Sequence, residues 1–429
     1  MRPPDAPLDG SVREMVFETL KRYPRTFKVL VASALIENVA FGLIIPYLTL
    51  YMLYDIGISE VMTGVVLMTY TVAGVPAMII GGMLADRIGR KPVLLASLGL
   101  MSVTMLMYFF AYDFTTLVIL AFADAFVGSM YMPAANAMIA DLIPRHERPK
   151  AFSTMRIAWN VGIVLGPSIG ALIVSASSMS VLFVFGSVVL AGAFVMNFVY
   201  IKETKPTDAK PEDITFRKVL AVGKDHPFLL LCALTGVLWF CFAQWMSVLP
   251  VYATGDLDLE DYEWGLMFTV SSLMVVATQL SVTGYVVKFR RSSVLMAGHM
   301  TVALGFTLIF LSFDFWSLLA CIIVITIGEI LYMSILSTVI ADMAPCTKRG
   351  SYMGFSGFVQ TLGNGIGFLL GMTLLAKMPE ASMIWLVVGA IGFTTGLGYM
   401  LFSSIVGPEH NDPKVIERLR SEAIAEDIE

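Results

Sequence analysis

The sequence predicts an all-α membrane protein with twelve transmembrane helices. Of its 429 residues, 57% are hydrophobic and only 14% are charged, whereas soluble domains carry about 25% charged residues. The mean hydropathy is +0.79. Apolar runs of the ~20 residues that a helix needs to cross hydrocarbon recur along the chain. Lysine and arginine gather in every second connection between these runs, so the charges are segregated rather than spread.

The apolar runs give the expected order of elements. Charged or proline-containing segments separate them, so their number is firmer than their ends. The first run carries Glu37 and Asn38 in its middle and is longer than the signal-peptide core of about 7–15 residues, so we interpret it as a retained helix. The expected spans are 27–52, 61–82, 92–112, 115–139, 151–174, 180–201, 227–251, 263–287, 293–312, 315–340, 351–376 and 383–405.

The charge asymmetry of the connections predicts that both termini are cytoplasmic. Basic residues precede the first run, follow the second, fourth, eighth and tenth runs, and fill the long connection after the sixth. The opposite connections hold mostly acids, among them Asp55, Asp113 and Asp314. The expected organisation is a cytoplasmic N-terminal segment (1–26), a six-helix bundle (27–201), a cytoplasmic central loop (202–226), a second six-helix bundle (227–405) and a cytoplasmic tail (406–429).

The two predicted bundles are related by an internal repeat. Ile139-Ala140-Asp141 recurs 201 residues later as Ile340-Ala341-Asp342. The same register pairs Arg90 with Arg291 and Gly166 with Gly367 without a gap. A single match could arise by chance, but one register kept from Arg90 to Gly166 indicates that the two halves share one architecture.

A charged segment separates the second and third runs: Gly82-Met83-Leu84-Ala85-Asp86-Arg87-Ile88-Gly89-Arg90-Lys91. A charge at the bilayer centre costs roughly 2.5–3.5 kcal/mol, so we expect a tight loop at the membrane face, with the glycines allowing close helix approach. The segment matches G-x-L-A-D-R-x-G-R-K at every position and resembles the signature loop of the major facilitator superfamily. The resemblance implies two parallel six-helix repeats with a binding site near the membrane midplane between them.

The resemblance also implies a charge network that latches the two halves at the cytoplasmic face. Asp86, Arg90 and Asp141 take its positions. Asp342 repeats Asp141, and we expect it to pair with Arg290 or Arg291. The alternative is that these residues are surface charges worth about 0–1 kcal/mol. The latch residues implied by the motif and the repeat are Gly82, Asp86, Arg87, Gly89, Arg90, Asp141 and Asp342.

The fifth run carries a second motif, Gly162, Gly166, Pro167 and Gly170. Glycines four residues apart give a helix face that allows close packing, and the proline frees a backbone carbonyl and favours a kink. The pattern resembles the G-x-x-x-G-P-x-x-G motif of drug:proton antiporters in this superfamily. The alternative is an ordinary small-residue packing seam.

Three acids lie inside apolar runs: Glu37, Asp124 and Glu329. At 1.5 Å per residue, they lie about 15, 24 and 18 Å from the cytoplasmic ends of their runs. Because an isolated carboxylate in hydrocarbon is costly, each is a candidate proton carrier. Alternatively, neighbouring polar groups satisfy them; Arg156 is placed to reach Glu37 more readily than Asp124.

Exporters of this type usually carry an arginine where this chain has Asp124. The segments Gly328-Glu329-Ile330-Leu331-Tyr332-Met333 and Arg349-Gly350-Ser351-Tyr352 resemble the tenth helix and its loop in a lactococcal proton-coupled multidrug exporter. That resemblance implies coupling through membrane carboxylates rather than through an arginine.

Aromatic residues, amides and some of the 28 methionines are candidates to line an adaptable central cavity. Few buried bases favour cationic or neutral ligands. We expect the four histidines to be loop or interface residues rather than proton relays. The candidate cavity residues are Asn38, Phe41, Tyr131, Asn136, Arg156, Asn160, Trp239, Gln244, Tyr332, Met333 and Asn364.

These patterns predict a proton-coupled exporter of small amphiphilic molecules in the cell membrane, powered by the proton gradient and acting as a monomer. We expect no cofactor, metal or nucleic-acid partner, and an enzyme is disfavoured because no nucleophile–base, metal or phosphate-binding pattern appears. Two alternatives remain at this point: proton-coupled uptake or facilitated transport of a metabolite, and lipid or lysolipid translocation or sensing on the same fold.

Overall fold

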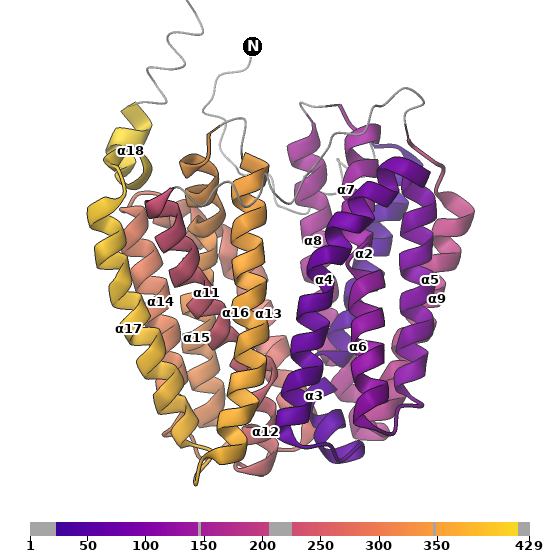
Figure 1. Cartoon of the computed structure of the whole chain (residues 1–429), viewed down its shortest axis with the longest axis horizontal. Helices are drawn as coiled ribbons and strands as arrows, with labels where there is room; N and C mark the ends of the chain where they lie inside the picture. Colours follow the sequence, from indigo (N-terminus) through magenta and orange to yellow (C-terminus); the bar gives the residue numbers. More distant parts are fainter. Residues whose placement is uncertain (1–22, 145–146, 206–224, 346–348, 419–429) are drawn as a thin grey trace, which may run out of the picture.

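The computed structural model describes residues 23–144, 147–205, 225–345 and 349–418, and throughout these ranges the regular structure is helical (Figure 1). Most of the predicted segment 1–26, and parts of the central loop and of the tail, lie outside the described residues. Within these described ranges, eleven helical segments are long and apolar enough to cross a membrane. The helix α13 (Asp261–Val286) is a further helix of 26 residues packed in the same assembly.

The chain before the central loop forms what we call the N-terminal half, and the chain after it the C-terminal half. The N-terminal half contains α2 (Arg25–Ile44), α3 (Leu48–Leu50), the short π-helix η1 (Tyr51–Asp55), α4 (Glu60–Ile88), α5 (Arg90–Tyr108), α6 (Phe114–Gly128), α7 (Tyr131–Leu142), α8 (Arg148–Ala176) and α9 (Met179–Tyr200). The C-terminal half contains α11 (His226–Met246), α12 (Val248–Gly255), α13, α14 (Arg291–Ile309), α15 (Phe315–Met343), α16 (Arg349–Lys377), α17 (Met383–Ile405) and α18 (Pro408–Asn411).

Three of the expected continuous spans are broken, each beside a proline. The first helix stops just before Pro46, the fourth is interrupted at Ser129, and the seventh at Ser247. Proline lacks the N–H that would bond the carbonyl four residues earlier, and its ring collides with that carbonyl. Pro133 and Pro250 stand four residues after Ser129 and Met246, whose carbonyls therefore lack the usual helical partner. Proline alone does not locate a break, because Pro76 and Pro167 lie within the continuous helices α4 and α8.

The signature segment is not the loop that its charges predict. Helix α4 continues through Gly82 and Asp86 to Ile88, and α5 begins at Arg90. The turn is reduced to Gly89, whose φ of +114° favours glycine. The charged residues are accommodated because they lie in the last turn of one helix and the first turn of the next, where long side chains reach the interface.

Charge divides the assembly into two ends. What we call the basic end holds Arg87 at the end of α4, Arg148 at the start of α8 and Arg291 at the start of α14. The acidic end holds Asp55 at the end of η1, and also Glu60, Asp113, Asp256 and Asp314 at other helix termini. This segregation agrees with the alternation of charge between successive connections in the sequence.

The two halves meet along two helix pairs, with α4 packed on α16 and α8 on α13. In Figure 1 the N-terminal half (indigo to magenta) and the C-terminal half (rose to yellow) come together near α3 and α12. Three hydrogen bonds between described residues cross from one half to the other, and their side-chain donors or acceptors lie on α3, α8 and α13. All three lie toward the acidic end.

Candidate functional site

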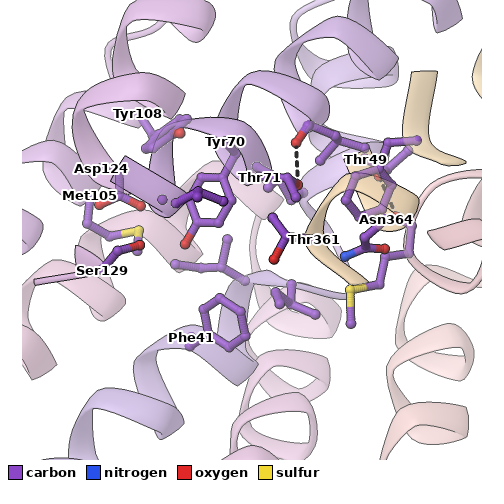
Figure 2. Close-up of a pocket in the computed structure, with 18 of the residues that line it drawn as sticks. Phe41, Thr49, Tyr70, Thr71, Met105, Tyr108, Asp124, Ser129, Thr361 and Asn364 are labelled. Atoms are coloured by element: carbon purple, nitrogen blue, oxygen red, sulfur yellow. Dashed lines mark hydrogen bonds between the residues drawn. The ribbon is translucent and has the colours of Figure 1, made fainter. Parts of the chain in front are cut away.

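Two cavities lie where the halves meet. The N-side chamber, of about 300 Å³, is formed mainly by α2, α4, α5 and α6, and α16 supplies part of its wall (Figure 2). The C-side chamber, of about 360 Å³, is formed by α8, α11, α13, α15 and α16. Met246 and Asn364 line both chambers. Each volume is at the lower end of the range for small-molecule sites.

Asp124 lines the N-side chamber from α6 and is only 4% exposed. Thr104 Oγ1 lies 2.6 Å from Asp124 Oδ1 and 3.0 Å from the carbonyl oxygen of Met101. A hydroxyl has one hydrogen to donate. If that hydrogen is donated to Met101, the short contact with Asp124 needs a hydrogen on the carboxyl group; if it is donated to Asp124, the carboxylate is charged. The pair therefore accommodates both forms of Asp124.

Glu329 lines the C-side chamber from α15. No hydrogen bond to its carboxyl group is found within the described ranges. The wall around it is aromatic: Trp239, Phe242, Trp245 and Phe268. A carboxylate among aromatic side chains is suited to a cation with apolar substituents, because aromatic rings can attract positive charge with their faces.

Glu37 lines neither chamber. One of its carboxyl oxygens is buried and has no hydrogen-bond partner among the described residues. Arg156 is exposed, and no ion pair to Glu37 is found in the described part of the chain, so the expected contact between them is not made.

The predicted cavity residues divide into two groups. Those that line a chamber are Phe41, Asn160, Trp239, Met333 and Asn364. Those that line neither are Asn38, Tyr131, Asn136, Arg156, Gln244 and Tyr332. Asn38 instead donates from Nδ2 to the carbonyl of Ala34 at 2.8 Å on its own helix.

Gln244 and Tyr332 correct the cavity prediction because both are engaged in packing between helices. Gln244 donates from Nε2 to the carbonyl oxygens of Phe240 and Gly367, at 2.9 and 3.0 Å, and ties α11 to α16. The hydroxyl of Tyr332 lies in a buried chain with Thr235 and Tyr399, at 2.8 and 2.7 Å. Both were candidates because aromatic and amide side chains suit a cavity, but here they contact neighbouring helices of the C-terminal half.

One histidine also departs from the expectation of loop or interface positions. His299 lies inside α14 and is fully buried, with its ring 5.7 Å from that of Tyr399. Neither ring nitrogen has a hydrogen-bond partner in the described structure. Its neighbours are aromatic, which is consistent with a neutral ring in the core.

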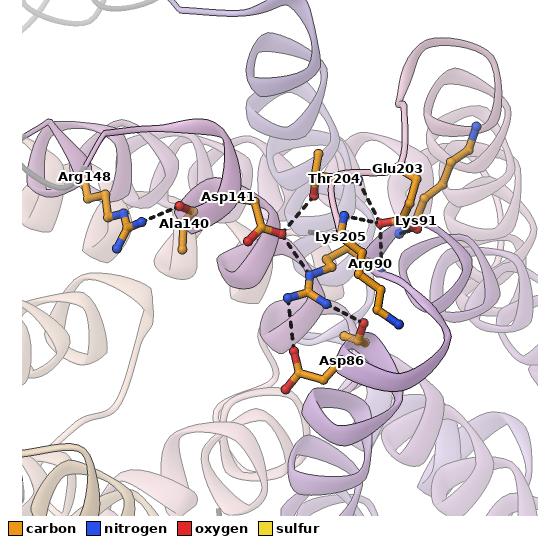
Figure 3. Close-up of polar contacts among 10 residues, drawn as sticks. Asp86, Arg90, Lys91, Ala140, Asp141, Arg148, Glu203, Thr204 and Lys205 are labelled. Carbon is orange, nitrogen blue, oxygen red and sulfur yellow. Dashed lines mark hydrogen bonds and ion pairs between the residues drawn. The ribbon is translucent and has the colours of Figure 1, made fainter. Parts of the chain in front are cut away.

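Three of the predicted latch residues, Asp86, Arg90 and Asp141, meet at the basic end (Figure 3). Arg90 Nε lies 2.9 Å from Asp141 Oδ2, its Nη2 lies 3.1 Å from Asp86 Oδ1, and its Nη1 donates to the carbonyl of Ala85. These groups belong to α4, α5 and α7, all in the N-terminal half. Within the described ranges no hydrogen bond or ion pair that joins these side chains to the C-terminal half is found, so in this structure the network ties helices of one half together.

The start of the central loop is hydrogen-bonded to the same network, and we call Glu203 and Thr204 the strap. Glu203 accepts hydrogen bonds from the backbone N–H groups of Arg90 and Lys91, at 3.0 and 3.1 Å, where α5 lacks a side-chain cap of its own. Thr204 donates to Asp141 at 3.2 Å. Partial burial opposes the charge of Glu203, but hydrogen bonds from Lys205, Arg90, Thr204 and Lys91 outweigh it, and its pKa is lowered.

A similar arrangement occurs in the C-terminal half. Arg291 Nη2 lies 2.6 Å from Asp342 Oδ2, and one of the two expected pairings of Asp342 is therefore made. The chain beyond α17 then returns to the start of α14, where Asn411 Oδ1 accepts from the backbone N–H of Ser292 at 2.9 Å. Arg290 pairs instead with Asp412 at 3.6 Å. Each half thus holds the start of its third long helix with a side chain from beyond its sixth.

The glycines of α8 pack against α2. A methyl group at Gly166 would lie 2.5 Å from the Cα atom of Gly42, and one at Gly162 would lie 2.7 Å from the Cβ atom of Asn38. Gly170 meets the backbone of Leu43 in the same way. Pro167 lies within the continuous helix α8. The motif therefore forms a close seam inside the N-terminal half.

Two residues of the site were not predicted from the sequence. Tyr70 lines the N-side chamber from α4 (Figure 2). Thr104 contacts Asp124 from α5. Single hydroxyls in apolar runs are common, so neither carries a distinctive pattern. The depth of Asp124 in the membrane could have indicated such residues, because a buried carboxyl group needs a polar neighbour from an adjacent helix.

Comparison with known proteins identifies the class. The family model of the Major Facilitator Superfamily matches residues 30–367 and 252–424. The curated relatives include an uncharacterised MFS-type transporter, YttB, of Bacillus subtilis, 27% identical over 88% of this chain and 95% of the relative. A Na(+), Li(+), K(+)/H(+) antiporter of Planococcus maritimus is 26% identical over 81% and 89%. The quinolone resistance protein NorA of Staphylococcus aureus is 24% identical over the same shares.

The solved structures agree on the fold. A POT family transporter in complex with a thioalcohol-conjugated peptide superposes with a TM-score of 0.76, at 15% identity, over 90% of this chain and 99% of that one. A bacterial homologue of the human lysosomal transporter Spinster gives 0.74, at 13% identity, over 89% and 96%. The fold and the chambers between its halves define a membrane transport protein. The chain belongs to the major facilitator superfamily and is a multi-pass protein of the cytoplasmic membrane.

Proposed function

We propose that this protein is a proton-coupled antiporter that exports small amphiphilic molecules, cationic or neutral, by alternating access. The two six-helix bundles, 27–201 and 227–405, act as the moving units, with both termini cytoplasmic and the basic end facing the cytoplasm. The protein works as a monomer. Its substrate and protons exchange through the two chambers between the halves.

The observation that carries the proposal is the presence of one membrane acid in each chamber. Asp124 lines the N-side chamber and Glu329 the C-side chamber, and the two cavities share Met246 and Asn364. An acid in a transporter cavity can exchange a proton for a cationic ligand, because its negative charge is costly inside the membrane unless a positive charge neutralises it. Tyr70 lines the N-side chamber together with Asp124.

The aromatic wall of the C-side chamber defines the substrate class further. Trp239, Trp245 and Phe268 line this chamber together with Glu329. An organic cation would gain both cation–π contact and burial of its apolar groups. The likeness to NorA, named for quinolone resistance, supports export of such compounds rather than uptake.

Transport into proteoliposomes under an imposed pH gradient tests the proposal. With tetraphenylphosphonium as the probe, we expect Asp124→Asn and Glu329→Gln each to abolish gradient-driven transport. Matched controls are Asp113→Asn and Asp314→Asn, which remove acids that cap the starts of the same two helices at the acidic end. Gradient-driven transport that persists in both chamber variants would contradict proton coupling through these acids.

A second candidate function is exchange of alkali cations for protons. The relative from Planococcus maritimus is a Na(+), Li(+), K(+)/H(+) antiporter, and the N-side chamber combines the Asp124 carboxyl group with the hydroxyl-bearing residues Thr71 and Ser129. Oxygen ligands of this kind suit hard cations. Collapse of the pH gradient on adding Na⁺ or K⁺, without an organic probe, would favour this function.

A further inference from the structure

The breaks of the first and seventh helices face each other across the two halves. Pro250 has no N–H, so it cannot bond the carbonyl of Met246 four residues earlier, and that oxygen is left without its helical partner. The hydroxyl of Thr49, from the other half, donates to it at 2.7 Å. Thr49 is fully buried. A buried carbonyl without a partner is costly, so this single hydroxyl satisfies a need created by the opposite half.

The N-terminal break receives a donor from the C-terminal half in return. The indole Nε1 of Trp264, at the start of α13, donates to the carbonyl of Pro46 at 2.8 Å. Trp264 is fully buried. Thr49 and Pro250 are also related by the 201-residue repeat. The donor in one half and the proline in the other thus occupy equivalent places in the two repeats.

The residues that form these two bonds line the chambers or pack against residues that line them. Thr49 lines the N-side chamber and Met246 lines both chambers. The ring of Trp264 packs edge to face with that of Phe268, at 5.1 Å between centroids, and Phe268 lines the C-side chamber. The contacts that join the halves therefore belong to the same surface that a ligand would meet.

We propose that the hydrogen bonds Thr49–Met246 and Trp264–Pro46 form a lock that holds the acidic end closed. Opening that end separates the halves there and breaks both bonds. Each break then leaves one backbone carbonyl and one side-chain donor to be satisfied by water. Because Met246 and Phe268 face the chambers, a ligand that shifts either side chain acts directly on the lock. This proposal concerns a conformational equilibrium and does not depend on which substrate is moved or on proton coupling.

The test is a distance measurement between spin labels in a background in which the native cysteines are replaced. Labels at Tyr112 and Phe313, exposed residues at the acidic end of each half, report that end, and labels at Ile88 and Lys288 report the basic end. In Thr49→Val with Trp264→Phe, we expect a longer-distance population at the acidic end and a shorter one at the basic end. Each lost bond should change the ratio of populations about two- to ten-fold.

Matched variants separate the lock from packing. Thr49→Ser keeps the hydroxyl and should keep the wild-type distances. Trp385→Phe removes the N–H of another fully buried tryptophan, one whose Nε1 has no partner among the described residues, and should also leave them unchanged. If the double variant does not fold, each single variant should show a smaller shift in the same direction. Unchanged distances in the lock variants, or an equal shift in Thr49→Ser, would overturn the proposal.

Discussion

Arg291 Nη2 lies 2.6 Å from Asp342 Oδ2, and Arg90 stands in the same relation to Asp141, at 2.9 Å, 201 residues earlier. Both arginine side chains are only 8% exposed. The repeat has therefore kept the arginine–aspartate pair in both halves, although the rest of the signature has changed in the second: Val287 stands where Asp86 is found in the first. This pairing of a third-helix arginine with an acid at the end of a later helix is a property of each half by itself.

From this pairing we predict that Asp342→Asn and Asp141→Asn each lower the thermal stability of the protein. Asp342→Asn removes the charged partner of the buried Arg291 guanidinium, which costs about 1–3 kcal/mol. Arg90 keeps its contact with Asp86 in Asp141→Asn, so we expect a smaller loss in that variant. Asp412→Asn is the control and should be close to neutral, because it disturbs the looser pair with the exposed Arg290 at 3.6 Å and leaves a side-chain oxygen to accept from the backbone N–H of Lys414. Thermal unfolding in detergent measures the effect. A control variant as unstable as Asp342→Asn would show that the buried pairs have no special weight.

Asp86 should behave differently from Asp141. Its side chain is 40% exposed, and its contact with Arg90 is the longer one, at 3.1 Å. We therefore predict that Asp86→Asn changes stability by less than about 1 kcal/mol. If the family latch operates here, the same variant shifts the balance between open and closed basic ends, while ligand affinity in a fixed conformation stays unchanged. Label distances across the basic end check this, and no shift in them would remove the latch role.

The strap at Glu203 predicts a pH dependence. Its pKa is lowered in the folded protein, so its stabilising contribution is present above the ordinary value of about 4.3 and disappears as the pH falls through the lower folded value. Glu203→Gln should lower stability at pH 7 by roughly 1 kcal/mol, as for loss of a helix cap, and the gap to wild type should close in acid. The exposed Glu380→Gln is the control. A gap that is constant with pH would contradict a role for the charge.

Thr104 allows a test of how the proton of Asp124 is held. Thr104→Val keeps the shape but removes the hydroxyl 2.6 Å from Asp124 Oδ1. We expect it to reduce gradient-driven transport about ten-fold or more, since a buried carboxyl group loses its hydrogen-bond partner, while probe binding without a gradient is kept. Thr104→Ser should restore transport. Equal activity of the valine and wild-type proteins would exclude this positioning role.

Much of the fold could be predicted because a membrane helix is specified by composition over some twenty residues. Hydropathy could not predict the local breaks in the helices. The breaks at Ser129 and Ser247 become understandable only when the backbone hydrogen bonds that Pro133 and Pro250 cannot make are considered. The acids Asp124 and Glu329 could be found because charge is rare in such runs. Gln244 and Tyr332 were misplaced because a polar face in a bundle can point to a neighbouring helix as well as to a cavity, and the sequence does not distinguish the two.

The seam between α2 and α8 provides the last prediction. A Cβ atom at Gly166 would lie 2.5 Å from the Cα atom of Gly42, a backbone contact that no rotamer can relieve. Gly166→Ala should therefore push the helices apart and lower stability by about 1–3 kcal/mol, as overpacking does. Gly192→Ala, in α9, meets nothing within 4 Å and should be neutral or stabilising by up to about 1 kcal/mol. Thermal unfolding of the two variants side by side decides the matter: equal effects would mean that helix propensity, and not the close approach at Gly166, governs the substitution.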